Sequence, residues 1–265
     1  MFVANTLRAE DCHLVYDGTY DGLLTVVFEC YRLKLTPTEI QVQGAPAKDL
    51  FANRQPLTIA TDKTSAQRVA AGITKYGGRQ TASELYQVFL SENGQREMVV
   101  YQYLRLLFEQ QKAINAHYHI DVVLLVSQLV KQMGREIHRM HAFVRFQELA
   151  DGLYFAPIEP DFDVLPLAHQ HFVKRYAAMR WCIYDIKRNY GLLYDGGPVQ
   201  TVVLDMDFSG NTMQLPAEVL SANELAYQQL WKDYFKSTNI TERKNLKLHL
   251  RHVPSRYWKY LTEKW

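Results

Sequence analysis

His141-Ala-Phe-Val-Arg-Phe-Gln-Glu-Leu149 and Leu153-Tyr-Phe-Ala156 flank the dipeptide Asp151-Gly152. Apolar and polar side chains alternate along the first run, which is the two-residue repeat of a half-buried strand. Asp-Gly is a favoured pair in the tight turns that join antiparallel strands. The stretch therefore predicts a β-hairpin in the middle of the chain, and it decides the fold class.

Strand and helix signals are grouped along the chain rather than alternating. Strands are predicted at residues 13–16, 40–42, 57–60, 180–186, 191–194 and 199–206. Helices are predicted at residues 23–34, 64–76, 81–92, 97–112, 120–140, 166–177 and 216–236. Such grouping indicates an α+β fold, with antiparallel sheet regions packed against several amphipathic helices. We expect one compact domain over residues 1–265, and a subdivision, if there is one, near residue 115.

Local signals mark the ends of several helices. Asp21 is placed to cap the helix predicted at residues 23–34, because a side-chain carboxylate can accept hydrogen bonds from the first free backbone N–H groups. Gly77-Gly78 ends the helix predicted at residues 64–76. Thr81-Ala-Ser-Glu84 has the pattern of a capping box, which predicts that a new helix begins there.

The helix predicted at residues 120–140 has two unlike faces. Apolar residues recur on one face at intervals of three and four: Val130, Met133, Ile137 and Met140. Basic residues fall on the opposite face: Lys131, Arg135, His138 and Arg139. Arg135 and Arg139 are therefore candidates for contact with an anionic partner.

Composition excludes several classes of protein. The chain has 265 residues, of which 48% are hydrophobic and 22% charged, a globular rather than a disordered composition. Three scattered cysteines (Cys12, Cys30 and Cys182) argue against a disulfide scaffold, a cysteine zinc site and an iron–sulfur cluster. No apolar stretch approaches the ~20 residues that span a bilayer. We expect a soluble, cytoplasmic protein with no membrane partner, no metal and no cofactor.

Two patterns invite a metal or a catalytic interpretation. Histidines form four close pairs, at 117/119, 138/141, 169/171 and 249/252, but none stands in a recognised zinc framework. Asp205 and Asp207 could hold a cation, although Asp207-Phe-Ser-Gly-Asn211 is also an ordinary turn sequence. There is no GxSxG, P-loop or GxGxxG motif, so no acyl-transfer or nucleotide-binding signature is present.

The predicted strand at residues 141–149 presents a face of mixed character. His141, Phe143, Arg145 and Gln147 point to one side, and the alternate apolar residues point to the core. An exposed aromatic ring between cations is a common way to hold single-stranded nucleic acid. The alternative is that another layer covers this face and that Arg145 pairs with a carboxylate such as Glu159.

The last thirty residues hold the strongest charge asymmetry. Residues 236–265 contain eight Lys or Arg and two acids, a local charge of +6 in a chain of net charge +2. On a helix that begins near Thr241, one face carries Arg243, Lys244, Lys247 and Arg251. Pro254 ends that helix, and Arg256-Tyr-Trp258-Lys-Tyr260 then interleaves bases with aromatic rings. The segment is either a phosphate-binding surface or a solvated charged face.

The chain resembles a domain-of-unknown-function family associated with DNA metabolism and DNA repair. The resemblance spans nearly the whole chain and rests on the combined order of several short stretches, each weak alone. They are Tyr16-Asp-Gly-Thr-Tyr-Asp-Gly-Leu-Leu24, Met140-His-Ala-Phe-Val-Arg-Phe-Gln147, Pro157-Ile-Glu-Pro160, His171-Phe-Val-Lys-Arg-Tyr176, Trp181-Cys-Ile-Tyr-Asp185, Tyr194-Asp-Gly196, Asn245-Leu-Lys247 and Pro254-Ser-Arg-Tyr-Trp258. The resemblance implies that stand-alone members act beside a radical-SAM protein, while related domains are fused to uracil-DNA glycosylases. The stretch Asp185-Ile-Lys-Arg-Asn-Tyr-Gly191 fits the stand-alone type better.

Three functional hypotheses remain open at this point. The favoured one is an accessory protein that binds DNA and presents it to the radical-SAM partner. The partner would carry the iron–sulfur cluster, because this chain lacks the cysteines that hold one. Its nucleic-acid-binding candidates are Arg135, Arg139, His141, Phe143, Arg145, Arg243, Lys247, Arg251, Arg256 and Trp258. The second is an enzyme that acts on nucleic acid through unrecognised residues, with Arg145, Glu159, His171 and Asp185 as candidates. The third is an adaptor that binds only protein.

Overall fold

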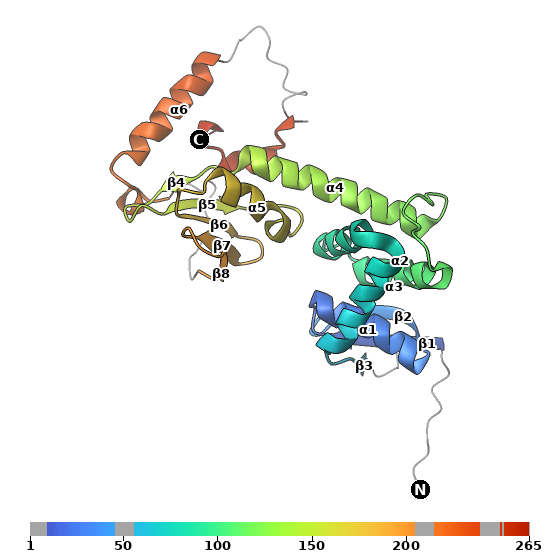
Figure 1. Cartoon of the computed structure of the whole chain (residues 1–265). Helices are drawn as coiled ribbons and strands as arrows, with labels where there is room; N and C mark the ends of the chain where they lie inside the picture. Colours follow the sequence, from blue (N-terminus) through green and yellow to red (C-terminus); the bar gives the residue numbers. More distant parts are fainter. Residues whose placement is uncertain (1–9, 46–55, 205–214, 239–249, 251, 265) are drawn as a thin grey trace. The chain divides into compact units, whose positions relative to one another are not determined.

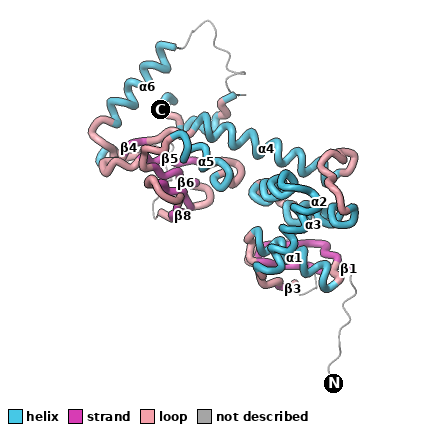
Figure 2. Tube along the Cα trace, in the orientation of Figure 1, coloured by secondary structure: helices cyan, strands magenta, loops and turns pink. Residues whose placement is uncertain are grey.

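The computed structural model describes residues 10–45, 56–204, 215–238, 250 and 252–264 of the chain. Contacts group the chain into two compact units, residues 1–133 and residues 134–265, and the boundary falls inside one long helix. Both units contain helices and strands (Figures 1 and 2), which confirms the α+β class. That residues 1–265 form a single domain stays a prediction.

A parallel sheet forms one layer of the first unit. Its described strands lie in the order β2-β1-β3. They are β1 (Glu10–Tyr16), β2 (Thr36–Val42) and β3 (Leu57–Thr58), and helix α1 (Tyr20–Leu33) connects β1 to β2. A helical crossover of this kind is what a parallel pair of strands requires. Leu23, Val26 and Val27 of α1 are fully buried with Leu14 and Tyr16 of β1, so the helix covers the sheet through its apolar face.

Helix α1 is capped by Thr19, not by Asp21 as the sequence predicted. Thr19 has an extended backbone, and its hydroxyl accepts a hydrogen bond from the Gly22 N–H at 2.9 Å. The Asp17 carboxylate holds Thr19 in place through the Thr19 N–H at 2.9 Å. Asp21 therefore lies two residues after the cap, in the first turn of the helix, where its negative charge interacts favourably with the helix dipole.

Three long helices complete the first unit. They are α2 (Lys63–Leu90), α3 (Arg96–Gln110) and the first part of α4 (Asp121–Phe143). The predicted break at Gly77-Gly78 is present, because Gly78 has a φ of +78° inside α2. A second helical segment follows Gly78, as predicted, but Thr81 does not form its capping box, because Thr81 Oγ1 donates back to the Gly77 carbonyl at 2.7 Å.

The second unit is built on a mixed sheet with its described strands in chain order. They are β4 (Gln147–Glu148), β5 (Tyr154–Ile158), β6 (Trp181–Asp185), β7 (Tyr190–Tyr194) and β8 (Gln200–Val202). The hairpin at Asp151-Gly152 is confirmed, and β6, β7 and β8 form the predicted antiparallel meander. Strands β5 and β6 pair in parallel, unlike the other neighbouring strands of this sheet. The segment that contains α5 (Leu165–Arg175) returns the chain to the end of the sheet at which β5 begins.

The long strand predicted at residues 141–149 is wrong. His141 and Phe143 form the last turn of α4, the chain then runs without regular structure to Phe146, and only Gln147 and Glu148 pair as strand β4. His141, Phe143, Arg145 and Gln147 therefore do not share a strand face. Helix α4 continues past Met140 to Phe143, so helical structure overrides a short alternating pattern that fits either structure.

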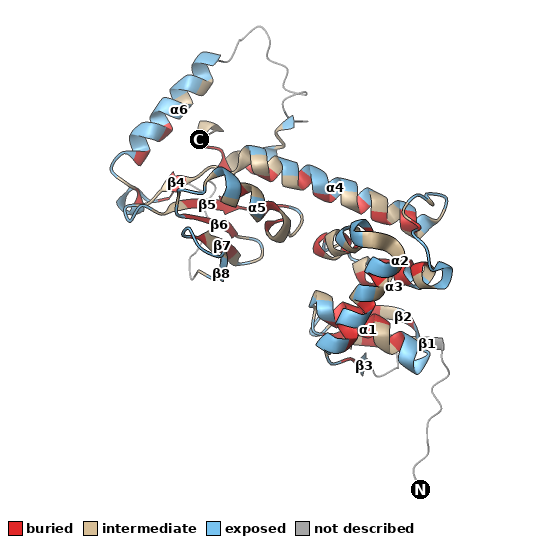
Figure 3. Cartoon of the chain, in the orientation of Figure 1, coloured by how far each residue is buried: buried red, intermediate tan, exposed pale blue. Residues whose placement is uncertain are grey.

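The C-terminal part of the second unit adds further helical segments. They are η1 (Ala217–Val219), α6 (Glu224–Thr238), η3 (Ser255–Tyr260) and η4 (Thr262–Lys264), and α6 packs against η4. Figure 3 shows that most of α6 is exposed. The basic helix predicted from Thr241, with Arg243, Lys247 and Arg251, and the Asp205/Asp207 pair lie outside the described residues. In the described part of the chain, no helix is both long and apolar enough to cross a membrane.

Candidate functional site

The end of α4 and the loop after it place the first site residues. Arg145 folds back over the helix terminus, and its Nη1 donates to the Ala142 carbonyl at 2.8 Å. The last carbonyls of a helix have no partner within the helix and carry partial negative charge, so an arginine here is stabilising. Arg145 is thus a cap of α4 rather than a member of a strand.

Arg145 also forms a part-buried ion pair. Its Nη2 lies 2.8 Å from Glu263 Oε1 and its Nε lies 3.3 Å from Glu263 Oε2, while the Trp231 indole N–H donates to the same carboxylate at 2.9 Å. Burial by itself raises the pKa of Glu263, but the hydrogen bonds from Arg145 and Trp231 outweigh it and hold the pKa below its usual value. The covered ion-pair alternative therefore describes Arg145, with Glu263 as the carboxylate in place of the expected Glu159.

His141 and His171 form a stacked pair beside Arg145. Their ring centroids lie 4.0 Å apart with an interplanar angle of 18°. The His141 ring hydrogen-bonds to the Ala168 backbone, and its buried Nε2 has no partner among the described residues. Burial, followed by the charges of His171 and His138, lowers the pKa of His141. His141 is therefore neutral at neutral pH, with an unused acceptor nitrogen.

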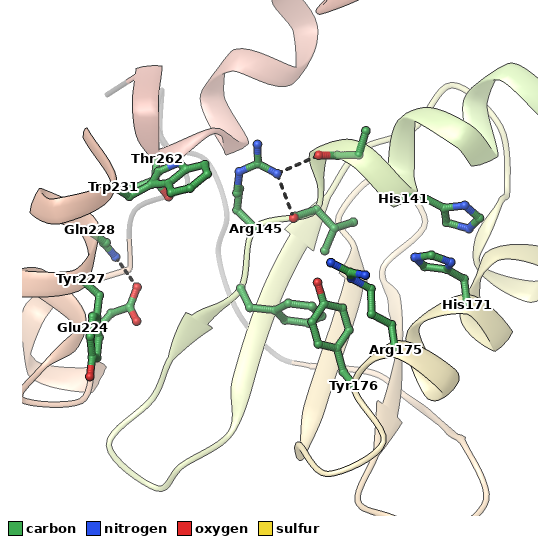
Figure 4. Close-up of a pocket in the computed structure, with 13 residues that line it drawn as sticks. His141, Arg145, His171, Arg175, Tyr176, Glu224, Tyr227, Gln228, Trp231 and Thr262 are labelled. Atoms are coloured by element: carbon green, nitrogen blue, oxygen red, sulfur yellow. Dashed lines mark hydrogen bonds between the residues drawn. The ribbon is translucent and has the colours of Figure 1, made fainter. Parts of the chain in front are cut away.

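These residues line a cavity of about 770 Å³ between the end of α4, α5 and α6. Figure 4 shows His141, His171 and Arg175 on one wall, Arg145 above the centre, and the α6 side chains on the opposite wall. Arg175 is exposed, forms no ion pair among the described residues, and lies with its guanidinium 5.7 Å from the centre of the Tyr176 ring. This wall thus carries a cation, Arg175, that no carboxylate of the described residues neutralises.

The wall formed by α6 is aromatic and polar. Tyr227 and Trp231 line the cavity with 59% and 40% of their surfaces exposed. Glu224 is buried below them, where its carboxylate accepts from the Glu148 N–H at 3.0 Å and from Gln228 Nε2 at 2.8 Å. Because Glu224 is only 7% exposed, the exposed side chains of this wall that can meet a ligand are the two aromatic rings.

A second polar cluster fastens η3 to the end of α4. Glu136 has an exposed fraction of only 1%, and its carboxylate accepts from Tyr257 at 2.5 Å, from Arg256 at 2.7 Å and from Arg139 at 3.2 Å. Burial raises the pKa of Glu136, but these donors and the Asp161 backbone N–H outweigh it and lower the pKa overall. Arg139 and Arg256 are thus engaged in an internal network.

The two carboxylate candidates lie at the ends of neighbouring parallel strands. Glu159 follows Ile158, which pairs in register with Asp185. Glu159 accepts hydrogen bonds from Tyr260 and from Lys259, and these outweigh burial and lower its pKa. Asp185 is fully buried and pairs with Arg188 at 2.7 Å; burial raises its pKa, and Arg188 offsets this only in part.

The structure distributes the predicted site residues over several places. Arg145, His141 and His171 share the cavity, whereas Glu159 and Asp185 lie in the ion-pair network at the strand ends. The remaining described candidates are each accounted for separately: Arg135 is exposed, Phe143 packs on Tyr257, and the Trp258 N–H donates to the Val253 carbonyl. The roles assigned to all of these residues stay predictions. Among the described residues no cluster of His, Cys, Asp and Glu is placed to hold a metal.

Sequence reasoning missed four residues that define the site. Glu136 interrupts the apolar side of α4, and a buried acid on that side is the available signal for an internal ion pair. Tyr227 and Trp231 lie four residues apart on α6, so their shared face could have been read from helical spacing. Arg175 carries no signal of its own, because only the fold brings α5 beside the end of α4.

Comparison with known proteins places much of the chain in a protein family. A family model described as a domain of unknown function, DUF4130, matches residues 94–263. The match includes every residue that lines the cavity. It covers residues 134–263 of the second unit and residues 94–133 of the first. No curated protein matches the chain.

Proposed function

We propose that the chain, which belongs to the DUF4130 family, is an accessory protein that binds single-stranded nucleic acid in the cavity between α4, α5 and α6 and serves a radical-SAM partner. The observation that carries the proposal is that Arg175, which has no ion pair among the described residues, lies across one cavity from the exposed rings of Tyr227 and Trp231.

The two walls suit the two chemical parts of a nucleotide. Arg175 supplies hydrogen-bond donors and positive charge for a phosphate group. Tyr227 and Trp231 supply flat faces on which bases stack without regard to sequence. A cavity of about 770 Å³ lies within the ~300–1,000 Å³ typical of ligand sites. A single strand, whose bases are free to leave the stack, fits this arrangement better than a duplex.

The accessory role follows from the cysteines and from the resemblance. A radical-SAM cluster is held by three closely spaced cysteine thiolates. Cys30 and Cys182 are buried in different units, Cys12 is half-buried, and no two of the three are close in sequence. Radical chemistry on DNA, which the resemblance implies, would therefore take place on a partner.

Binding to a fluorescein-labelled single strand, followed by anisotropy across a salt titration, tests the proposal. Arg175→Gln should weaken binding to all sequences alike and flatten the plot of log K against log[salt] by about 0.7. Tyr227→Ala should cost about 1–3 kcal/mol with little change in slope. Lys174→Gln is the matched control, since Lys174 is exposed, precedes Arg175 and does not line the cavity. Equal losses in the Arg175 and Lys174 variants would mean that the cavity has no special role.

The adaptor hypothesis has one observation in its favour. Leu230 and Tyr234 continue the exposed side of α6 beyond the cavity, with 64% and 60% of their surfaces exposed, and Tyr234 stacks on Trp231. Contiguous exposed apolar residues are typical of protein interfaces. Leu230→Lys should abolish co-elution with a co-expressed radical-SAM partner and leave binding to single strands intact. Unchanged co-elution would remove this face from the partner interface.

A further inference from the structure

A second cavity lies in the first unit, beside the break in α2. Gly78 leaves the helix with a φ of +78°, and a Cβ on Gly77 would lie 2.7 Å from the Thr81 side chain. Thr81 fills that space, with its Oγ1 2.7 Å from the Gly77 carbonyl and 2.9 Å from Asn115 Oδ1. The glycine pair therefore lets Thr81 turn inward and anchor the chain segment after α3.

Asn115 continues this network to an acidic side chain. Its Nδ2 donates to Glu84 Oε2 at 2.5 Å, and Gln80 Nε2 donates to Glu84 Oε1 at 2.8 Å. Each carboxylate oxygen thus has one fixed amide donor. Because an ionised carboxylate accepts about four hydrogen bonds in all, Glu84 keeps acceptor capacity toward the cavity that it lines.

Tyr103 faces the same cavity from α3 with an unused donor. Its side chain is fully buried, and its hydroxyl forms no hydrogen bond among the described residues. Burial is the main cause that raises the pKa of this hydroxyl to about 12; the adjacent Thr81 side chain offsets this in part, and the charge of Glu84 adds to it. The hydroxyl is therefore a protonated donor at neutral pH. A buried donor without an acceptor is unfavourable, so its presence needs an explanation.

The cavity has a volume of about 430 Å³ and a mixed lining. Val123 and Val126 of α4 are buried and give it an apolar wall. Tyr118 and Lys131 are exposed and stand at its edge. An apolar wall beside an adjacent donor and acceptor is a lining that a planar polar ring can use.

We propose that this cavity, lined by Glu84, Tyr103 and Asn115, is a binding site for a planar heterocycle that presents a hydrogen-bond donor next to an acceptor, as the edge of a nucleobase does. The ring donor goes to Glu84, and the ring acceptor takes the Tyr103 hydroxyl. The negative charge of Glu84 disfavours carboxylates and phosphates at the same point. The site is separate from the proposed nucleic-acid cavity and does not depend on it.

Isothermal titration calorimetry of the full chain with thymidine tests the site. Thymidine has a ring N–H between two carbonyl groups, and N3-methylthymidine lacks only that donor. Thymidine should bind, and its N3-methyl derivative should not. Tyr103→Phe should weaken thymidine binding about tenfold, the loss expected for one hydrogen bond. Tyr101→Phe is the matched control, since Tyr101 is a buried tyrosine on the same helix that does not line the cavity.

Melting temperature separates this proposal from a purely structural role. Because the Tyr103 hydroxyl forms no hydrogen bond with any residue that the structure describes, Tyr103→Phe should melt at or above the wild-type temperature. A lower melting temperature would show an internal partner and overturn the proposal. Equal binding of thymidine and its N3-methyl derivative would also overturn it. So would the absence of binding to both thymidine and a short oligo(dT). Loss of oligo(dT) binding in Tyr103→Phe, with no binding of free thymidine, would assign the base to a strand. Salt-dependent binding in the second unit is measured separately, through Arg175→Gln.

Discussion

Replacing Arg145 with alanine should destabilise the second unit by about 3 kcal/mol. The side chains of Arg145 and Glu263 are 25% and 5% exposed, so the variant leaves a buried carboxylate without its cation; in fully buried pairs this costs about 3–5 kcal/mol. The Trp231 N–H still reaches Glu263 in the variant, which places the loss at the lower end. Urea denaturation followed by tryptophan fluorescence measures it selectively, because all four tryptophans lie beyond residue 134.

The controls separate charge burial from side-chain volume. Arg145→Met with Glu263→Met removes both partners and should recover most of the lost stability, since no buried charge is left unpaired. Arg145→Lys keeps the charge but not the planar fork, so it should lie between wild type and alanine. A midpoint loss in Arg145→Ala that corresponds to less than about 1 kcal/mol, at an unchanged denaturant slope, would refute the reasoning, because that is the value of a surface pair.

Further stability predictions concern other parts of the fold. Glu136→Gln should cost about 2 kcal/mol, read from the urea midpoint, because it removes the charge at the centre of the α4–η3 network. Glu136 and Glu263 have lowered pKa values in the folded chain. Their contribution to stability is therefore full above about pH 4.3, the usual pKa of a glutamate, and should be lost as the pH falls through the lowered values. An acid titration followed by fluorescence measures this loss. Gly191→Ala should lower the melting temperature, because its Cβ would lie 2.6 Å from the Tyr184 side chain. Thr19→Ala should cost about 1 kcal/mol through loss of the α1 cap, measured by circular dichroism on denaturation.

The helices with strong periodicity were predictable because their apolar faces repeat over several turns. Helix α4 is an example. The hairpin at Asp151-Gly152 was predictable for a different reason, because the turn sequence itself is a local signal. The strand predicted at residues 141–149 failed because a run of nine residues fits both a strand and a helix end. The parallel pairing of β5 and β6 depends on the path of α5, which is a property of the fold and leaves no local pattern.

The candidate site was predictable only in part, for a physical reason. Arg145 and His141 drew attention through their own segment, but their partners come from segments far along the chain: His171 on α5, Glu263 on η4 and Trp231 on α6. A sequence pattern shows which side chains share one element, not which elements meet. Arg256 shows the opposite error. Its place beside aromatic residues suggested nucleic-acid contact, but its guanidinium donates to Glu136 within the fold.

The most direct test of nucleic-acid binding in the α4–α5–α6 cavity is photocrosslinking with a 4-thiothymidine single strand, followed by mass spectrometry of the attached peptides. Bases stacked in the cavity should attach to Tyr176, Tyr227 or Trp231, and Arg175→Gln should lower the yield at all three. Attachment that avoids these three residues while the strand is bound would contradict the proposal.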